Sequence, residues 1–413
     1  MPVPLESLPQ ASRELVRLLR ATLAGLPPAP ATDWPAGMAL ATWHGVDAFL
    51  YPALVALPTD RQPPGAVLAA WRQQFLAAAA NTVRREEQTR ELLSALAAAT
   101  VRAVPLKGTW LAARVYADPS QRAMADIDLL VSLPDLATAR DAIARLGYLP
   151  YGNTASVALD CDQTYICPRH AWPLELHWNL GVASRTLHRP EVPGLWQRLV
   201  PEELLGVSVH VLCPEEHLVY LAYHVLHHHF RLPLRAYLDL VLLGCFLGTK
   251  ADRTRLNAIA AEWGMEQALP RVMAIAYDLF EQELPAPLAD WMPDAEAPQR
   301  EQAVFTILQS TAHGALPAER TLLAFQQRRP IARIGLVLRR VFLPREFLRR
   351  EYPCARWWIG LPLAYLLRGR DLLRRNAGPV RRVLQHDPAV DQQLDEAAAR
   401  EELMEWALGT DRT

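Results

Sequence analysis

The hydrophobic pattern predicts helices at both ends of the chain and a stretch of short strands between them. Apolar residues recur at helical spacing in "SRELVRLLRATLAGL" and in the longer "AVLAAWRQQFLAAAANTVRREEQTRELLSALAAA". The first pattern stops at Gly25, where a proline-rich linker begins. We therefore predict an N-terminal helical region over residues 1–100.

Short apolar runs replace the helical pattern between residues 101 and 213. They predict strands in "VRAVPLKG", "DIDLLVS", "SVALDCDQTYICP" and "PLELHWNL". Helices are expected in "TWLAARVYA" and "LPDLATARDAIARLGY". Strands and helices in this order predict a small sheet in an α/β or α+β domain.

The helical pattern returns at Pro214 and predicts a helical bundle over 214–320. The remaining residues, 321–413, form an arginine-rich region that ends in a predicted acidic amphipathic helix, "DQQLDEAAAREELMEWAL". Four prolines predict short helices here rather than one long helix; they are Pro330, Pro344, Pro353 and Pro362. The fold class is α+β, a small mixed sheet flanked by N-terminal helices and a C-terminal bundle.

Composition adds a charge asymmetry to this picture. The chain has 413 residues, 51% of them hydrophobic, and a net charge of −1. Its length predicts two to three domains. Between Arg328 and Arg382 there are fifteen arginines, no lysine and three acids. Such a segment is usually a solvated or acid-complementing surface. The alternative is an anionic partner, such as RNA, a phosphorylated acceptor or a membrane surface.

The cysteines and the hydropathy of the chain indicate in which cellular compartment the protein is expected. The five cysteines are widely spaced and form no CxxC, so neither a zinc ribbon nor a disulfide framework is indicated. The N-terminus shows no secretory signal. The longest apolar runs, "LDLVLLGCFLG" and "WWIGLPLAYLL", are shorter than the roughly 20 residues that span a bilayer. We predict a cytoplasmic protein without a transmembrane segment, and leave peripheral membrane contact open.

Two aspartates in "DIDLLV" are the first candidates for chemistry. Alternate residues of a strand share a face, so Asp126 and Asp128 point the same way while Ile127 points into the core. Two adjacent carboxylates repel each other unless a cation lies between them. Hard oxygen ligands suit Mg²⁺ or Mn²⁺. The pair therefore predicts a divalent metal site.

The motif "LKGTW" supplies a site for phosphate. A strand ends at Lys107, Gly108 permits a tight turn, and a helix is expected to begin at Thr109 or Trp110. Backbone N–H groups at a helix start attract anions, Thr109 adds a hydroxyl donor and Lys107 a positive charge. The alternative for Lys107 is a structural ion pair with one of the aspartates. The Walker A spacing is absent.

The motif "LELHW" provides a third acid. Glu175 and His177 share one face of a predicted strand. If this strand lies beside "DIDLLV", Glu175 completes a cluster of three carboxylates with Asp126 and Asp128. Three acids can hold two metal ions, one activating the attacking group and the other binding the triphosphate. For Glu175 alone, the alternative is an ion pair with an arginine.

These motifs resemble a known family. A Gly-Ser/Thr corner, a pair of acids in the pattern of "DID" and a third acid on a later strand are the signature of the polymerase-beta-type nucleotidyltransferase superfamily. The chain is most similar to a bacterial group described as uncharacterised nucleotidyltransferases. The quoted motifs are "PLKGTWLAARVYADPSQRAMADIDLLV", "LELHWNL" and "YHVLHHHFRLPLRAYLDL". The resemblance runs over residues 40–250.

The resemblance implies a nucleotidyltransferase core in the sheet region and two divalent metal ions, Mg²⁺ or Mn²⁺. It implies transfer of a nucleoside monophosphate from a nucleoside triphosphate to a hydroxyl or phosphate, with release of pyrophosphate. Gly108 and Thr109 match the corner, Asp126 and Asp128 the paired acids, and Glu175 the third acid. The acceptor stays open among a peptide, a protein, a small molecule and RNA, and so does the base of the nucleotide.

A histidine-rich helix follows these motifs. His224 and His228 are spaced to share a helix face, where we expect them to contact the nucleotide or the acceptor. Packing within the core and a zinc pair are the alternatives. His177 is counted with them, and with Lys107, among the residues expected to bind the nucleotide. Asp239 is expected to pair with one of these histidines or with a nearby arginine, Arg231 or Arg235.

Two rival functions remain from the sequence. "DID" is also a DxD motif, which in glycosyltransferases binds a nucleotide-sugar through Mn²⁺, but the residues before the first strand here are helical. A catalytically degenerate binding protein is the second alternative. It would have no need for three mutually repelling acids.

Overall fold

The structure is a computed structural model that describes most of the chain. The described residues are 8–27, 33–152, 160–181, 194–291, 296–310, 348–349, 352–357, 360–384 and 388–410. The chain divides into two compact units, the first formed by 1–311 together with 404–413 and the second by 312–403. The finer division of the first unit at residues 100 and 213 stays a prediction.

A five-stranded sheet lies in the first unit, with the strand order β1-β2-β5-β4-β3. The strands are β1 Val104–Pro105, β2 Ile127–Leu130, β3 Leu149–Pro150, β4 Asp162–Ile166 and β5 Leu174–His177. Only the pair of β2 and β5 is parallel, and the other neighbouring strands are antiparallel. The predicted small mixed sheet, and with it the α+β fold class, is confirmed.

The strand β2 is central to the site, and its sequence explains its burial. All of its residues are buried, as expected for a strand covered on both faces. The chain reaches it from β1 through α5 (Gly108–Arg114) and a short 3₁₀ turn, η2 (Pro119–Gln121). Helix α5 begins at Gly108, one residue before the earliest predicted start.

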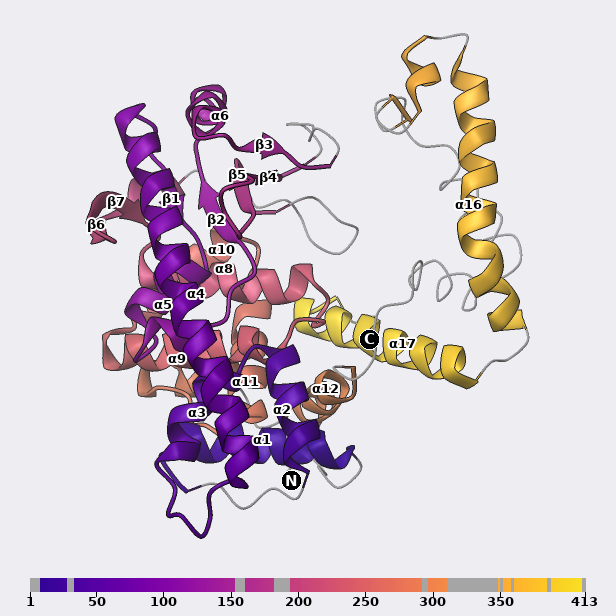
Figure 1. The fold of residues 1–413 in the computed structure, drawn as a ribbon. Helices are drawn as coiled ribbons and strands as arrows, with labels where there is room; N and C mark the ends of the chain where they lie inside the picture. Colours follow the sequence, from indigo (N-terminus) through magenta and orange to yellow (C-terminus); the bar gives the residue numbers. More distant parts are fainter. Residues whose placement is uncertain are drawn as a thin grey trace. The chain divides into compact units, whose positions relative to one another are not determined.

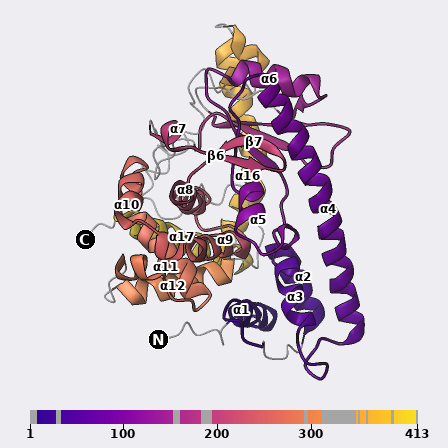
Figure 2. The ribbon, with the colours of Figure 1, turned by 90° about the vertical axis from the view of Figure 1, so that its left-hand side faces the viewer.

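The N-terminal helices form as predicted and extend to the sheet. They are α1 Gln10–Leu23, α2 Trp34–His44, α3 Asp47–Val55 and α4 Gly65–Ala98. Helix α4 contacts α2 and α3 near one end, and α6 (Leu136–Arg145) farther along (Figures 1 and 2). The long helix thereby ties the N-terminal helices to the sheet.

A β-hairpin near residue 200 was not predicted. It follows α7 (Leu195–Arg198) and consists of β6 Val200–Leu204 and β7 Val207–Val211. Leu205 and Gly206 connect the strands with φ angles of 54° and 74°, the conformation of a two-residue hairpin turn. The hairpin packs against β1 and α4 at the edge of the sheet.

A helical bundle completes the first unit and confirms the predicted return to helix. Its helices are α8 Pro214–His227, α9 Leu234–Leu247, α10 Arg253–Glu262, α11 Ala268–Leu279 and α12 Ala297–Ser310. Helix α8 contacts α9, α10 and α11, and nearly all of its residues are buried. It is therefore the central helix of the bundle, and its buried residues include Glu215, Glu216 and His217 beside the apolar majority.

The second unit corrects one expectation. Helix α16 (Leu361–Leu384) is 24 residues long, whereas the prolines predicted only short helices. Pro362 lies in its first turn, where proline is tolerated because the backbone N–H there has no partner within the helix. Leu348, Ala355 and Ala364 form a small core in this unit. The part of the arginine-rich segment before residue 348, with the anionic partner predicted for it, lies outside the described residues.

The predicted C-terminal helix is present as α17 (Pro388–Leu408). Its end belongs to the first unit, where Trp406 packs on Arg271 with 5.2 Å between the guanidinium carbon and the ring centre. Among the described helices, none combines the length and hydropathy needed to cross a membrane.

Candidate active site

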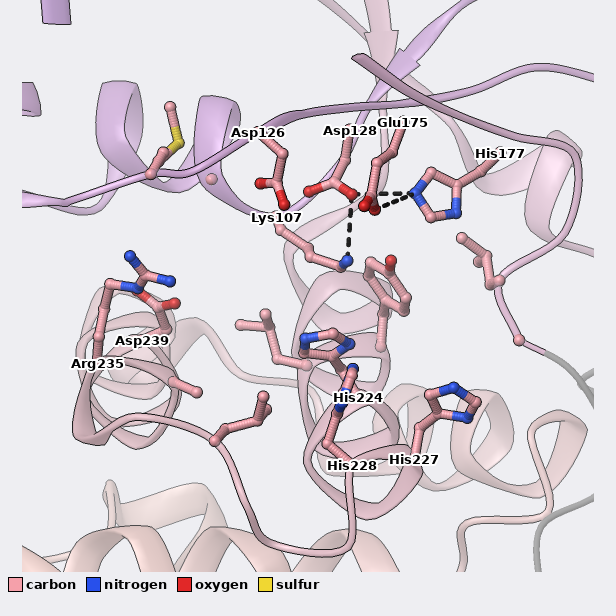
Figure 3. Close-up of a pocket in the computed structure, with 18 of the residues that line it drawn as sticks. Lys107, Asp126, Asp128, Glu175, His177, His224, His227, His228, Arg235 and Asp239 are labelled. Carbon is pink, nitrogen blue, oxygen red and sulfur yellow. Dashed lines mark hydrogen bonds and ion pairs between the residues drawn. The ribbon is translucent and has the colours of Figure 1, made fainter. Parts of the chain in front are cut away.

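A cavity of about 400 Å³ opens between the sheet and the helices α8 and α9 of the first unit (Figure 3). One wall is formed by the ends of β1, β2, β4 and β5, which carry mostly acidic side chains. The other wall is formed by the histidines of α8 and the start of α9. Within the first unit, this cavity brings together most of the residues that the sequence singled out.

The register of β2 and β5 places two of the acids side by side. Asp128 lies directly opposite Glu175, so the two side chains leave the same face of the sheet. Asp126 comes immediately before β2 and lies beside Asp128 (Figure 3). All three carboxylates line the cavity. The adjacency of the two strands, on which the three-carboxylate hypothesis depended, is therefore present.

Asp128 has two basic neighbours. Lys107 Nζ lies 3.2 Å from Asp128 Oδ1, and His177 Nε2 lies 3.0 Å from the same oxygen. His177 Nε2 is also 3.6 Å from Glu175 Oε2. Lys107 therefore forms the ion pair with an aspartate that was the alternative to a phosphate contact, and it also lines the cavity.

The two aspartates differ in their affinity for a proton. Burial alone would raise the pKa of Asp128, but the positive charge of Lys107 and the hydrogen bond from His177 hold it well below its usual range. The pKa of Asp126 is raised to about 6 by burial and by repulsion from Asp128 and Glu175. Around Asp126, the negative charge of the carboxylates is therefore not fully neutralised by the basic residues of the site.

Lys107 and His177 keep their positive charges in this environment. Burial disfavours the charged form of each, yet the pKa of Lys107 is raised because Asp128 and the neighbouring acids outweigh the desolvation. The pKa of His177 is raised for the same reason, chiefly by its hydrogen bond to Asp128.

The corner at Lys107 has an unusual backbone. Lys107 adopts φ of 41° and ψ of −109°, a conformation that costs energy in a residue with a side chain. A Cβ on Gly108 would lie 2.1 Å from Met124 Sδ and 2.5 Å from a guanidinium nitrogen of Arg122. A side chain at this position would force Met124 and Arg122 to move, and glycine avoids this.

Thr109 is the one predicted nucleotide-binding residue that lies away from the cavity wall. It is 7% exposed and does not line the cavity, whereas Lys107 and Gly108 do. Its role in binding stays a prediction.

A buried ion pair joins the sheet to the bundle, and its arginine was missed from the sequence. Arg122 Nη2 lies 2.7 Å from Asp239 Oδ2, and Tyr116 donates a hydrogen bond of 2.7 Å to Asp239 Oδ1. Asp239 was expected to pair with a histidine, Arg231 or Arg235, so this expectation is corrected. Arg122 and Asp239 are separated by 117 residues, and no local signal marks them as partners.

Arg235, from the start of α9, adds a positive charge to the cavity wall. It donates a hydrogen bond to the carbonyl of Ala123, just before the aspartates. Burial lowers its pKa, although guanidinium stays protonated at neutral pH. Sequence reasoning had considered Arg235 only as a partner for Asp239.

His224 and His227 of α8, and His228 just after it, line the opposite wall, while contact of His224 and His228 with the nucleotide or acceptor stays a prediction. The rings of His224 and His228 are 4.5 Å apart at their centres. Burial lowers the pKa of His224 well below its usual range and that of His228 to about 4. Both are therefore neutral at pH 7, and neutral imidazoles can both donate and accept hydrogen bonds.

The comparison with known families decides the classification. The family model for uncharacterised nucleotidyltransferases matches residues 30–281, which include the sheet, the cavity and α8 to α11. The chain belongs to this family. It is therefore a nucleotidyltransferase, and the match gives no support to the glycosyltransferase or binding-protein alternatives.

Solved structures offer a more distant similarity to this nucleotidyltransferase. Two structures of the antibiotic-resistance factor ANT(2″)-Ia align at a TM-score of 0.33 and 14% identity. The solution structure covers 44% of this chain and 91% of its own. The crystal structure in complex with adenylyl-2″-tobramycin covers 43% and 96%. Among curated proteins, no significant match was found.

The donor atoms on the acidic wall of this nucleotidyltransferase fit a hard divalent cation. Ligand atoms of Asp128, Glu175 and His177 lie within 4.8 Å of one another. The pKa of Asp126 is raised by burial and then by repulsion from Asp128 and Glu175, and a cation among the carboxylates would relieve that repulsion. Carboxylate oxygens are the ligands that Mg²⁺ and Mn²⁺ prefer.

Proposed function

We propose that this cavity transfers a nucleoside monophosphate from a nucleoside triphosphate to a hydroxyl or phosphate of an acceptor, with release of pyrophosphate. The observation that carries the proposal is that Asp128 on β2 lies opposite Glu175 on β5, with Asp126 just before β2, at one cavity wall. We also place the chain in the bacterial group of the polymerase-beta-type superfamily, on the motifs quoted above.

The three carboxylates are proposed to hold Mg²⁺ or Mn²⁺. The bound metal would polarise the phosphate oxygens and activate the attacking group. Asp128 is pre-ionised by Lys107 and His177, so it is ready to coordinate at neutral pH. Asp126 must lose its proton near pH 6, so metal binding at lower pH competes with protonation.

Lys107 and Gly108 are proposed to bind the donor's phosphates, with Thr109 as a further contact. The Lys107 ammonium is charged and faces the cavity, and the strained backbone at this residue turns the chain toward α5. Strain of this kind is found most often at functional sites. Positive charge here neutralises the charge that develops on the phosphates during transfer.

His224 and His228 are proposed to contact the nucleotide or the acceptor across the cavity, and His177 to orient Asp128 and Glu175. A neutral imidazole can orient an acceptor hydroxyl or accept its proton. Arg235 adds a charge close to Asp126, where it can meet an anionic group of either substrate. The acceptor is proposed to be a peptide, a protein, a small molecule or RNA.

The proposal is tested by following the transfer of a labelled α-phosphate from a nucleoside triphosphate to an acceptor. The purified chain is incubated with Mg²⁺, each nucleoside triphosphate labelled at the α-phosphorus and a cell extract that supplies acceptors. We expect pyrophosphate release and incorporation of label, lost in Asp128→Asn and in Glu175→Gln. Glu87→Gln, at an exposed acid on α4, is the matched control and should keep the activity.

Two results would contradict the proposal. One is incorporation that persists undiminished in Asp128→Asn, which would place the chemistry elsewhere. The other is silence with every nucleoside triphosphate combined with transfer of a labelled sugar from a nucleotide-sugar, which would favour the glycosyltransferase.

A further inference from the structure

A second group of potential metal ligands shares the cavity but differs in chemistry from the three carboxylates. Cys161, Asp162 and His177 line the cavity where β4 lies beside β5. Their ligand atoms all lie within 4.8 Å of one another. The group offers a thiol, a carboxylate and an imidazole, a set that suits a softer cation than Mg²⁺.

Strand pairing and nearby backbone hydrogen bonds fix the positions of all three residues. Asp162 is the direct partner of His177 in the antiparallel register of β4 and β5, so their side chains leave the same face. The carbonyl of Cys161 accepts hydrogen bonds from the backbone N–H groups of Trp178, at 2.9 Å, and Asn179, at 3.2 Å. The thiol lies 3.0 Å from Asp162 Oδ1. Asp162 and His177 are therefore held by the sheet, and Cys161 by backbone hydrogen bonds just beyond the ends of β4 and β5.

His177 provides a second sign that a ligand is missing. Its side chain is 7% exposed, and its Nδ1 has no hydrogen bond of ordinary geometry to a described residue, although the ring interacts with the nearby Cys161 thiol. Its other nitrogen, Nε2, points to Asp128 and Glu175 (Figure 3). A buried ring nitrogen without a partner costs free energy, and native structures rarely leave one unmatched.

We propose that Cys161, Asp162 and His177 form a zinc site, with the thiolate, a carboxylate oxygen and Nδ1 as ligands. Asp128 then accepts a hydrogen bond from Nε2–H of His177. This is the carboxylate–histidine–zinc arrangement that fixes the ring and makes it a better ligand. Zinc binding displaces the proton of the Cys161 thiol, and any proton on Nδ1, into solution.

The site has three protein ligands, so a fourth coordination position faces the cavity. Zinc sites with three protein ligands keep that position for water or a substrate atom, whereas structural zinc sites are closed by four. Because the residues line the cavity, this position is within reach of whatever binds there. The inference goes beyond nucleotide transfer and does not depend on it, since zinc binding is measured without nucleotide or acceptor.

The test uses the full chain, stripped with a chelator and titrated with Zn²⁺, then with Co²⁺ as a spectroscopic substitute. With Mg²⁺ in excess to occupy the three carboxylates, we expect one zinc per chain and a thiolate-to-cobalt charge-transfer band. Cys161→Ser should abolish the band and weaken zinc binding at least about tenfold, since a ligand matters more than an outer-shell partner. Cys245→Ser, at an exposed thiol outside the cavity, should keep both.

Two further variants separate this site from the three carboxylates. Asp128→Asn should keep the cobalt band but weaken zinc binding about 10–100-fold, as loss of an outer-shell partner does. Asp126→Asn should leave zinc binding unchanged. Circular dichroism of each variant confirms that it is folded.

The opposite results would overturn the proposal. A chain that binds no zinc, or that shows no thiolate band with cobalt, has no such site. Zinc that binds Cys161→Ser as tightly as the native chain is held elsewhere. Zinc that is lost in Asp126→Asn but kept in Cys161→Ser occupies the three carboxylates instead.

Discussion

Asp126 and Asp128 are two residues apart, yet their surroundings give them opposite proton affinities. Asp128 faces Lys107 and His177, which stabilise its charge. Asp126 faces mainly other acids, and its pKa rises to about 6. A site arranged in this way holds unrelieved negative charge next to a carboxylate that is always ionised, which is the condition under which a divalent cation binds best.

We predict that Asp126→Asn stabilises the metal-free protein at pH 8. The native pKa of about 6 exceeds the unfolded value of 3.8, so protonated Asp126 stabilises the fold. This stability is fully present below pH 3.8 and lost as the pH rises through 6. The charge therefore costs up to about 3 kcal/mol at pH 8, which the amide avoids.

Urea unfolding in the presence of a chelator measures this difference. The advantage of the variant should shrink to roughly half at pH 5, where much of the native Asp126 is protonated. Adding Mg²⁺ should raise the stability of the native chain but not that of the variant. A variant that is less stable than the native chain at pH 8 would show that Asp126 has a partner that outweighs the repulsion.

The site residues that could be predicted from the sequence are those that belong to a local sequence pattern. Asp126, Asp128 and Glu175 could be found because strand alternation predicts which side chains share a face. Arg122 could not, because its partner Asp239 is 117 residues away and only the tertiary fold brings them together. Gly108 was also identified from the sequence, but as a residue that permits a tight turn. Its neighbours Met124 and Arg122, rather than a ligand, fill the space that a side chain would need.

At the scale of elements, the fold depends on how the sheet is joined to the bundle. The acids lie on the sheet and the histidines on α8, so the cavity exists only while these parts stay together. The Arg122–Asp239 pair links the segment before β2 to α9, and both side chains are almost fully buried, at 6% and 2% exposure. We infer that this pair holds the two walls of the cavity in register.

We predict that Arg122→Ala and Asp239→Ala each destabilise the protein by about 3–5 kcal/mol, because either change leaves a buried charge unpaired. The double variant Arg122→Ala with Asp239→Ala should lose less stability than the two single changes combined. Denaturant unfolding of all variants measures this. Arg90→Ala, which breaks a surface pair with Glu87, is the control and should change little.

Additive losses in that cycle would contradict the link between the walls. They would mean that Arg122 and Asp239 stabilise the protein independently of each other.

Other elements show where sequence patterns succeed and where they fail. Helices α8 and α9 and strands β2 and β5 follow from long or strongly alternating patterns. The β6–β7 hairpin was not predicted, because its first strand, "VPEEL", carries a proline and two adjacent glutamates and shows no clear alternation. Helix α16 was underestimated because proline was treated as a breaker wherever it occurs, whereas Pro362 lies in the first turn of α16 and the helix also continues through Pro379.

At the scale of the whole molecule, the chain returns to its first unit after completing the second. Residues 404–413 belong to the first unit, and Trp406 is 8% exposed there. Its carbonyl accepts a hydrogen bond of 2.7 Å from Arg271 Nη1. Helix α11, which carries Arg271, contacts both α8 and α9 behind the cavity. Trp406 and the end of α17 are therefore part of the core that supports the site.

We predict that Trp406→Ala lowers the unfolding free energy of the first unit by about 3–5 kcal/mol, the usual cost of emptying a buried aromatic site. Trp357→Ala is the matched control, because Trp357 is 75% exposed and should tolerate the change. Thermal and urea unfolding compare the two. Equal effects of the two substitutions would contradict the assignment of residues 404–413 to the core of the first unit.

The central claim is that Asp126, Asp128 and Glu175 together hold a divalent cation, and Mn²⁺ binding measured by electron paramagnetic resonance tests it most directly. The titration is made at pH 8 with a non-hydrolysable nucleoside triphosphate, on the native chain and on Asp128→Asn, Glu175→Gln and the control Glu87→Gln. We predict that both site variants bind Mn²⁺ at least about tenfold more weakly, while the control binds as the native chain does. Undiminished Mn²⁺ binding in Asp128→Asn and Glu175→Gln would contradict the claim.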